Sequence, residues 1–473
     1  MRTKYLINLF SIISLISSEL FLAKAEFKLD EINPDFNYAE WYKKETGFTP
    51  NAQWFGCWTI APRGDELYFG FATARPAEFD GAILAKFSGE WLITLGQFSE
   101  QGVHCIKWIG DTLYGIGSDP SIGDGWDGGN FYRYFPYSGE FEKVRYDSKK
   151  KPVLPNVLHS WGLCFDSSNS KFYVSTGSYD AQQYSKNGGN CGNPNDSTLA
   201  CFGQVWQSDD KGSSWSLNAG DRFNVLSNYR IYDVINYNDA IYITDGEMSN
   251  SNKLKKSGDD GKKWQILDGL NPAALFRMSV FKNRLIVAAN FARTYYTIDE
   301  NNNSSTLTMP GALNYSFNVF ANVEDRFLVT YFSDGSIYYT SDLLNWNEIL
   351  PASGRNFLSI AYWEKEKSIV LAERGVNGTI WKLNITDLLN TGVKVESEPE
   401  ITVISDNNFI SIKTNGKEIF SVKVFDVLGN IIEESTTKYS GNFKFNISQL
   451  TPGPYIICCK SYKNYFIRKI LKY

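Results

Sequence analysis

The chain has 473 residues, of which 43% are hydrophobic, and this is enough for a large buried core and for more than one domain. Aromatic residues make up 15% of the chain, with 38 glycines and only four methionines, a composition that favours β-strands and turns over helices. The formal net charge of -5 gives no general attraction to nucleic acid or to an anionic membrane surface. We therefore expect an all-β protein that does not bind nucleic acid.

Residues 1–25 have the features of a secretory signal peptide. Two basic residues precede a mostly apolar run over residues 5–16, and Ala-Lys-Ala at residues 23–25 places small residues where a signal peptidase reads the chain. Glu19 interrupts the run, which is shorter than the roughly 20 apolar residues of a membrane-spanning helix. We expect export to the periplasm and no transmembrane anchor in the mature chain.

A short apolar strand recurs seven times between residues 51 and 390, and a second strand marker recurs in phase with it. Each interval is long enough for four short strands. The sequence therefore predicts a seven-bladed β-propeller over residues 51–390, with eight blades or an irregular sandwich as the alternatives. Residues 26–50 form a lead segment that can supply a closing strand. The copies of the first marker are centred on Leu67, Leu113, Phe172, Ile241, Leu285, Phe327 and Ile369.

The pattern Ser-x-Asp-x-Gly-x-x-Trp occurs twice, 49 residues apart, each time between two strand-like runs. In such a turn the Ser and Asp side chains bond the turn's own amides, Gly takes the strained position and Trp fills the space beneath. The pattern resembles the Asp-box (BNR repeat) of sialidase-like β-propellers, and the resemblance implies a structural role. The residues concerned are Ser208, Asp210, Gly212 and Trp215 in one copy and Ser257, Asp259, Gly261 and Trp264 in the other.

The C-terminal part differs from the repeats. Residues 391–400 are predicted to be a charged linker, and residues 401–473 a small β-sandwich-like domain. The run Val-Lys-Val-Phe-Asp-Val-Leu-Gly-Asn at 422–430, then Leu-Thr-Pro-Gly-Pro-Tyr at 450–455 and a basic end, resemble the C-terminal sorting domain of the type IX secretion system of Bacteroidota. Pro454 departs from the usual apolar residue. The resemblance implies the type IX machinery as a partner and a location on the outer-membrane surface or outside the cell.

The seven cysteines are compatible with an oxidising compartment. Cys191 and Cys201 bracket a short polar loop that a disulfide can close, whereas Cys57, Cys105 and Cys164 lie in apolar runs and are expected in the core. No cysteine or histidine spacing is typical of a metal site, and the acidic loop 119–129 does not match a calcium loop. We predict neither a metal nor a cofactor.

In a propeller, the first strand of each blade lines the axis, and its start lies on the same face as the loop after the second strand. That face is the expected ligand site, and cations and aromatic residues gather there. The first-strand positions hold Trp54, His104, His159, Trp161, Arg230, Tyr232, Arg277, Tyr315 and Arg355, and the loop positions hold Arg75, Asp127, Tyr179, Asp245, Glu247, Arg293 and Arg374.

The function that demands least of these residues is glycan recognition without catalysis. Aromatic side chains can stack on sugar faces, and arginines can bind a carboxylate with paired hydrogen bonds. The predicted ligand-binding residues are Arg230, Arg277, Arg355, Trp54, Trp161 and Tyr232.

A polysaccharide lyase acting on uronates is the alternative. In that mechanism the arginines hold the uronate carboxylate, His104 or His159 removes the adjacent proton, and Tyr179 acts as the acid. The likeness to propeller lyases is one of architecture and residue type only. A sialidase-like hydrolase is less favoured, because the first blade opens with Gln-Trp-Phe-Gly at 53–56 and lacks the expected Arg-Ile-Pro.

Overall fold

The structure is a computed structural model, and it divides the chain into two compact units, residues 1–388 and 389–473. The predicted signal peptide and the predicted linker lie outside the residues that it describes. The described residues are 27–51, 53–73, 81–89, 91–120, 125–126, 128–193, 196–221, 224–246, 253–267, 270, 275–289, 291–314, 317–390, 401–405, 409–426, 431–435, 439–451, 453–461 and 465–472.

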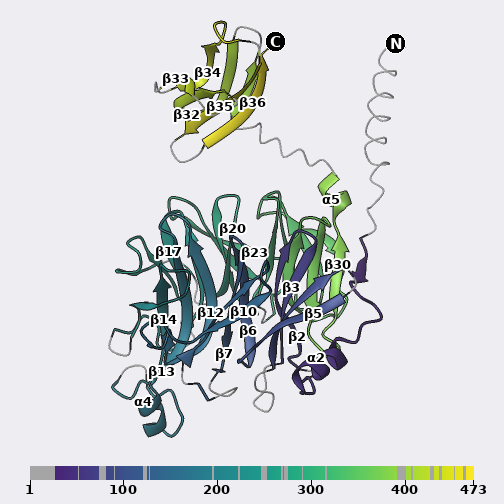
Figure 1. The fold of residues 1–473 in the computed structure, drawn as a ribbon, viewed down its shortest axis with the longest axis vertical. Helices are drawn as coiled ribbons and strands as arrows, with labels where there is room; N and C mark the ends of the chain where they lie inside the picture. Colours follow the sequence, from purple (N-terminus) through teal and green to yellow (C-terminus); the bar gives the residue numbers. More distant parts are fainter. Residues whose placement is uncertain are drawn as a thin grey trace, which may run out of the picture. The chain divides into compact units, whose positions relative to one another are not determined.

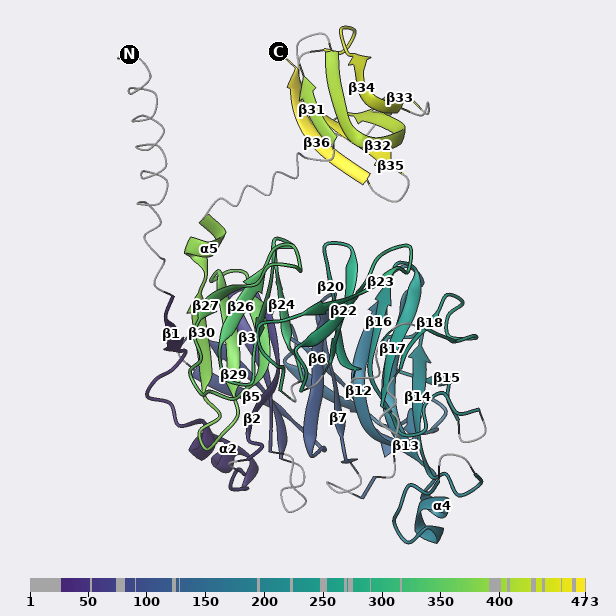
Figure 2. The same cartoon turned by 180° about the vertical axis from the view of Figure 1, so that it is seen from behind.

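The first unit is a seven-bladed β-propeller, as predicted, when the blades are counted over its described residues (Figures 1 and 2). Each blade is an antiparallel sheet of four strands. Blades 1 to 4 consist of β2 (Gly56–Arg63), β3 (Glu66–Ala72), β4 (Ala82–Ser88) and β5 (Trp91–Phe98); β6 (Gly102–Ile109), β7 (Thr112–Ser118), β9 (Phe131–Phe135) and β10 (Glu140–Val144); β12 (Val157–Asp166), β13 (Lys171–Tyr179), β14 (Cys201–Ser208) and β15 (Ser216–Ala219); and β16 (Arg230–Tyr237), β17 (Ala240–Gly246), β18 (Leu254–Ser257) and β19 (Gln265–Ile266).

The remaining blades complete the ring. Blades 5 to 7 consist of β20 (Leu275–Phe281), β21 (Arg284–Ala289), β22 (Thr294–Ile298) and β23 (Ser304–Thr308); β24 (Phe320–Val323), β25 (Phe327–Tyr331), β26 (Ile337–Thr340) and β27 (Asn347–Leu350); and β28 (Phe357–Trp363), β29 (Ser368–Glu373), β30 (Ile380–Asn384) and β1 (Leu29–Glu31). Outside the blades lie the short pair β8 (Gly128–Gly129) and β11 (Leu154–Pro155) and the helices α2 (Tyr38–Thr46), α4 (Ala181–Lys186) and α5 (Thr386–Asn390).

The local sequence explains this arrangement. The second strand of each blade is almost wholly buried, as in β3 and β17, whereas fourth strands such as β5 and β23 are largely exposed. First strands of neighbouring blades contact one another around a closed ring. In blades 4 and 5 a two-residue turn joins the first two strands, and both of its residues have positive φ. Such turns match the twist of an antiparallel hairpin.

A β-bulge recurs near the start of the first strand in six of the seven blades, all except blade 6. The register of β2 with β3 shifts at Trp58, that of β6 with β7 at His104 and that of β16 with β17 at Tyr232. Similar shifts occur in β12, β20 and β28. A bulge adds one residue to one strand and re-aims its side chain. These residues therefore form the top of the axial core.

The ring closes through the N-terminal lead segment. β1 pairs with β30, with Leu29 opposite Leu383 and Glu31 opposite Trp381. The helix α2 follows; it begins after Asn37, whose side chain accepts from the amide of Glu40 at 3.0 Å, and it ends at a glycine in the left-handed conformation. Its buried tyrosines Tyr38 and Tyr42 pack on Phe71 of β3 and on Phe55, the residue before β2.

The two Ser-x-Asp-x-Gly-x-x-Trp segments join third to fourth strands. In the first copy Ser208 Oγ donates to Asp210 Oδ1 at 2.8 Å and accepts from the amide of Gly212 at 2.9 Å, and Trp215 Nε1 donates to the carbonyl of Gly212 at 3.1 Å. The second copy has the same serine and aspartate bonds, at Ser257 and Asp259. These side chains satisfy the turn itself.

We expect Gly212→Ala to lower the free energy of unfolding by about 2 kcal/mol or more, because alanine is strained in this conformation. The φ of Gly212 is 82°, and a Cβ there would overlap the ring of Phe131. The matched control is Gly258→Ala in the second copy, where a Cβ meets nothing within 4 Å. Urea denaturation measures both variants, and equal stabilities would contradict the structural role of this turn.

The second unit is a six-stranded antiparallel sheet. Its strands are β31 (Ile401–Ser405), β32 (Phe409–Phe425), β33 (Ile431–Ser435), β34 (Tyr439–Asn446), β35 (Gly453–Ser461) and β36 (Tyr465–Lys472). The strand β32 runs without interruption from Phe409 to Phe425, and residues 427–430, the end of the run that resembles the sorting domain, lie outside the described residues. Pro454 lies within β35, opposite Leu471. No helix in the described parts of the chain is long and apolar enough to cross a membrane.

Candidate functional site

The entry face of the propeller is the face at which β12 and β16 begin and β13 ends. The helices α2 and α4 lie at this face in both views (Figures 1 and 2). A pocket of about 440 Å³, here called the entry pocket, opens between blades 2, 3 and 4. It is lined by Asp119, Leu158, His159, Gly177, Ser178, Tyr179, Tyr184, Cys191, Cys201, Tyr229 and Arg230.

A disulfide loop forms one wall of the entry pocket. Cys191 and Cys201 are bonded, with an S–S distance of 1.95 Å, and the amide of Ala200 donates to the carbonyl of Cys191 at 2.8 Å. Asn187 Nδ2 crosses the base of the loop to the carbonyl of Thr198 at 2.6 Å. The preceding helix α4 carries Tyr184, whose ring meets that of Tyr179 edge-on at 5.7 Å. The loop thus braces the aromatic wall.

Asp119, His159 and Arg230 form a chain across the floor of the pocket. β7 and β12 meet where Ser118 lies opposite His159, which brings the next residue, Asp119, to the imidazole. His159 Nδ1 lies 3.4 Å from Asp119 Oδ2, and His159 Nε2 lies 3.1 Å from Arg230 Nη2. A guanidinium can only donate, so Nε2 is the acceptor and the imidazole proton is on Nδ1, which lies near Asp119 but has no hydrogen-bond partner among the described residues.

The buried position of this chain shifts its proton equilibria. Burial raises the pKa of Asp119 to about 7, although the charge of Arg230 opposes the shift. Burial, followed by the charge of Arg230, holds the pKa of His159 well below its ordinary value. At neutral pH the imidazole is therefore neutral, and the Asp119 carboxyl is divided between its protonated and ionised forms.

Arg230 is held in place by aromatic rings and by a glycine. Its guanidinium lies over Tyr229 at 4.3 Å and over Trp161 at 5.4 Å from the ring centroids. A Cβ on Gly177 would come within 2.9 Å of Arg230 Cγ, so the absence of a side chain there leaves room for the arginine. These contacts place the Arg230 guanidinium in the pocket against aromatic rings.

His104 is enclosed in the axial core and does not line the entry pocket. It is 4% exposed, and its ring is stacked on Trp161 at 4.0 Å and on Trp58 at 5.8 Å. Phe317 stacks on Trp58 at 4.3 Å and completes the column. His104 Nδ1 lies 2.8 Å from the carbonyl of Ser160, and burial lowers the pKa of His104 to about 3. This enclosure argues against the predicted role of His104 as a base.

The three predicted arginines do not form one cluster. Arg277 is 6% exposed and donates to the carbonyls of Trp161 and Tyr232 at 3.1 and 2.9 Å, so it braces the axial core. Arg355 belongs to another pocket, of about 350 Å³, where it lies on Trp381 at 3.7 Å and pairs with Glu373. Of the three, only Arg230 lines the entry pocket.

The predicted aromatic residues are also divided. Trp161 is 3% exposed in the axial core, and the ring of Tyr232 packs against it at 5.1 Å. Trp54 lies under Arg374, away from the residues of the entry pocket. Four other predicted residues lie outside the described parts of the chain: Arg75, Asp127, Glu247 and Tyr315. Two further loop residues have partners outside the entry pocket. Asp245 is buried beside Lys255, and Arg293 donates to the carbonyl of Met309.

Asp119, Tyr184 and Tyr229 were not predicted as ligand-binding residues. Asp119 directly follows the second strand of blade 2, so the rule that selected Tyr179 at the end of β13 also applies to it. Tyr184 and Tyr229 belong to a loop helix and to a segment before β16, for which the strand pattern gives no position. No group of three or more His, Cys, Asp or Glu side chains that could hold a metal occurs among the described residues.

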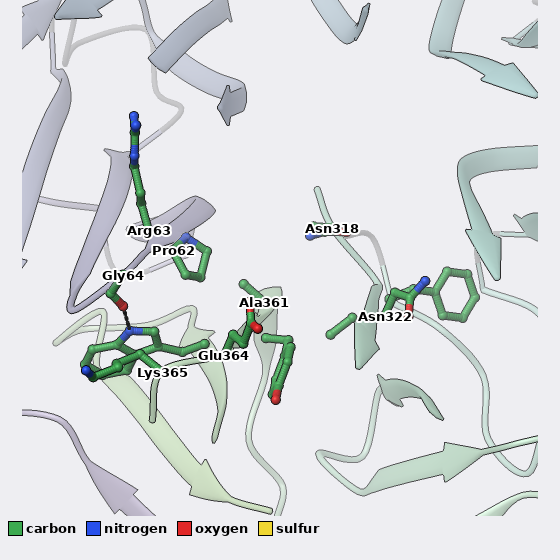
Figure 3. Close-up of a pocket in the computed structure, with 12 residues that line it drawn as sticks. Pro62, Arg63, Gly64, Asn318, Asn322, Ala361, Glu364 and Lys365 are labelled. Atoms are coloured by element: carbon green, nitrogen blue, oxygen red, sulfur yellow. Dashed lines mark hydrogen bonds between the residues drawn. The ribbon is translucent and has the colours of Figure 1, made fainter. Parts of the chain in front are cut away.

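The opposite face carries a wider basin at the axis, of about 760 Å³. Figure 3 shows it between Gly64 and Lys365 on one side and Asn318 and Asn322 on the other. Trp363 Nε1 donates to the carbonyl of Gly64 at 2.8 Å, the dashed line in Figure 3. Asn318 Nδ2 donates to the carbonyl of Ile360 at 2.8 Å. Because these hydrogen bonds connect neighbouring blades, we interpret the basin as the open end of the propeller axis on this face.

Comparison with known families identifies the tail. The model of the secretion system C-terminal sorting domain matches residues 406–473, and this confirms the predicted type IX sorting domain. The tail implies export through the type IX system to the cell surface or beyond. No curated protein matches the chain in sequence.

Solved β-propellers resemble the chain at low identity. A streptogramin B lyase is 13% identical over 76% of this chain and 97% of its own, with a TM-score of 0.46. PorZ, a surface component of the type IX secretion system of Porphyromonas gingivalis, is 10% identical over 90% of this chain and 60% of its own, with a TM-score of 0.45. An oligogalacturonate lyase from Vibrio parahaemolyticus is 10% identical over 77% and 95%, with a TM-score of 0.48. These similarities carry no information about function.

Proposed function

We propose that the protein is an exported β-propeller that binds glycans in the entry pocket. The observation that supports this most is the composition of that pocket, where three tyrosines and one arginine surround a buried His–Asp pair. Its volume of about 440 Å³ is within the range of small-ligand sites. The type IX tail brings the propeller to a place where surface and environmental polysaccharides are present.

The pocket matches the two-sided chemistry of a sugar ring. Tyrosine rings offer flat apolar surfaces for the C–H faces of a sugar, and their hydroxyl groups can exchange hydrogen bonds with its alcohols. Arg230 offers donors and Asp119 offers acceptors, so both kinds of partner for a sugar hydroxyl are present. Tyr179 is the last residue of β13, and its ring contacts that of Tyr184 in the aromatic wall, so it connects a blade strand to that wall.

A glycan array probed with the secreted protein tests this proposal. We expect Tyr179→Ala to bind the glycan at least tenfold more weakly, because one stacking surface is removed. The control is Trp91→Ala on the outer strand β5, since Trp91 is 71% exposed and lies outside the pocket. If Trp91→Ala lost binding and Tyr179→Ala kept it, the entry pocket would not be the site.

The disulfide should matter for binding more than for the fold. We expect the double variant Cys191→Ser, Cys201→Ser to bind the glycan about tenfold more weakly, because the loop must then be ordered by the ligand. The propeller should keep its melting temperature within a few degrees, since only Cys201, the first residue of β14, belongs to a blade. Calorimetric titration and thermal melting measure the two effects. Unchanged affinity would show that the loop does not preorganise the pocket.

Lyase action on a uronate is a second function for the same pocket, because His159, Arg230 and Tyr179 all line it. His159 Nε2 accepts from Arg230 in the structure, so it could act as a base only when a substrate carboxylate draws the guanidinium away. Cleavage would leave an unsaturated sugar that absorbs in the near ultraviolet. Growth of this absorbance on acidic polysaccharides would establish lyase action, and its absence with retained binding would favour recognition alone.

A further inference from the structure

We propose that the glycan bound in the entry pocket carries a carboxylate, that Arg230 binds this carboxylate, and that Asp119 confines the binding to neutral and acidic pH. This inference rests on the proposed function, because it concerns the same pocket. It adds the charge of the ligand and a proton-dependent competitor within the protein.

The charge of the ligand follows from the single cation in the pocket. Arg230 is the one lysine or arginine among the described residues that line it. A planar guanidinium matches a planar carboxylate with two parallel hydrogen bonds. A phosphate or sulfate group carries more acceptor oxygens and is commonly held by clusters of cations. One arginine between tyrosine rings therefore fits a uronic-acid type of sugar best.

Asp119 is placed to compete with that ligand. Its carboxyl lies next to His159 in the chain that ends at Arg230, and the two charges interact across the pocket floor. When Asp119 is protonated, the net charge of the pocket is the positive charge of Arg230, which attracts an anion. When Asp119 ionises, it neutralises this charge and repels a ligand carboxylate.

The two histidines near Arg230 do not change charge in the same range. His159 on β12 and His104 on β6 both have lowered pKa values, through burial first, so both are neutral at pH 6 and above. Burial raises the pKa of Tyr232. Among the described residues, the phenols of Tyr179, Tyr184 and Tyr229 also line the pocket, and Arg277 is buried below it in the axial core. Since burial raises the pKa of Asp119 to about 7, the change in pocket charge falls near neutrality.

The test is calorimetric titration of the full secreted protein with an oligouronide and with the methyl ester of the same oligouronide, at pH 6 and pH 8.5. The carboxylates of the free acid stay ionised across this range, and the ester removes the charge while it keeps the sugar. At pH 6 we expect the acid to bind about 10- to 100-fold more tightly than the ester, as for a charge-assisted hydrogen bond. At pH 8.5 we expect this preference to shrink several-fold.

The variant Asp119→Asn tests whether the ionisation of Asp119 causes the expected change in binding with pH. Asn is tolerated at the φ of 61° that Asp119 adopts, so the fold should persist. We expect Asp119→Asn to keep its preference for the acid at pH 8.5. Asp111→Asn, an exposed aspartate paired with Arg63, should behave as the unchanged protein does.

Each result decides a separate point. Equal binding of acid and ester would overturn the inferred ligand charge while leaving glycan binding intact. A pH dependence that persists in Asp119→Asn would overturn the role of Asp119. Failure of both compounds, together with an array on which no glycan is retained, would overturn the proposed function and this inference with it.

Discussion

Arg230→Ala is expected to weaken binding of an acidic glycan by about 30-fold or more. The change removes the only cation among the described lining residues, and it leaves the ligand carboxylate in a partly buried site without its partner. Losing one side of a charged hydrogen-bonded pair costs about 2–5 kcal/mol. The effect on a neutral glycan should be much smaller, because the tyrosine surfaces remain.

Two further variants show whether the loss of affinity comes from the paired hydrogen bonds of the Arg230 guanidinium. Arg230→Lys keeps the charge but not the paired geometry, so we expect an affinity between those of the unchanged protein and Arg230→Ala. Arg326→Ala removes a cation of blade 6 that lies over Phe327, and it should leave the affinity unchanged. Calorimetric titration measures all three. Full affinity in Arg230→Ala would remove the arginine from the site.

Tyr42→Ala is expected to lower the free energy of unfolding of the propeller by about 3–5 kcal/mol, the usual cost of deleting a large buried aromatic side chain. Tyr42 is fully buried on α2, its ring lies 4.9 Å from that of Phe55, and its hydroxyl donates to the carbonyl of Gly81 at 2.6 Å. It thus fastens the lead segment, and with it the closing strand β1, onto blade 1.

The control for this variant is Tyr42→Phe, which removes only the hydrogen bond and should cost about 1–2 kcal/mol. All 13 tryptophans of the chain precede residue 388, so tryptophan fluorescence in a urea titration reports on the propeller unit alone. If Tyr42→Ala unfolded at the same urea concentration as the unchanged protein, α2 would not contribute to ring closure.

The fold was predictable because local sequence repeats once per blade. The apolar second strands follow one another in phase, and the turns between first and second strands carry residues that accept positive φ, such as Asn238 and Asp239. Repetition of this kind fixes the number of blades without any long-range information. The long strand β32 was harder to predict from the sequence, because its middle section has no strong strand pattern.

The site was predictable only in part. The rule of strand starts and ends identified His159, Tyr179 and Arg230, which do share one pocket. It also selected His104, which the bulge in β6 turns into the axial core. A bulge depends on pairing between strands, so the position of a residue along its own strand does not reveal it.

The separation of the arginines has a similar cause. Arg230 begins β16 in blade 4 and Arg355 lies just before β28 in blade 7, and similar places in different blades do not imply proximity. Tyr184 was missed because it belongs to a loop helix, for which the strand pattern gives no position, whereas the rule that selected Tyr179 also applies to Asp119. Contacts between blades, rather than the pattern within one blade, decide which of the candidate residues meet.

A crystal structure of the protein with a glycan retained on the array tests the central claim most directly. The claim predicts the sugar in the entry pocket, stacked on Tyr179 or Tyr184 and in hydrogen-bond contact with Arg230. A glycan found instead in the axial basin of Figure 3, or beside Arg355 and Trp381, with the entry pocket empty, would contradict it.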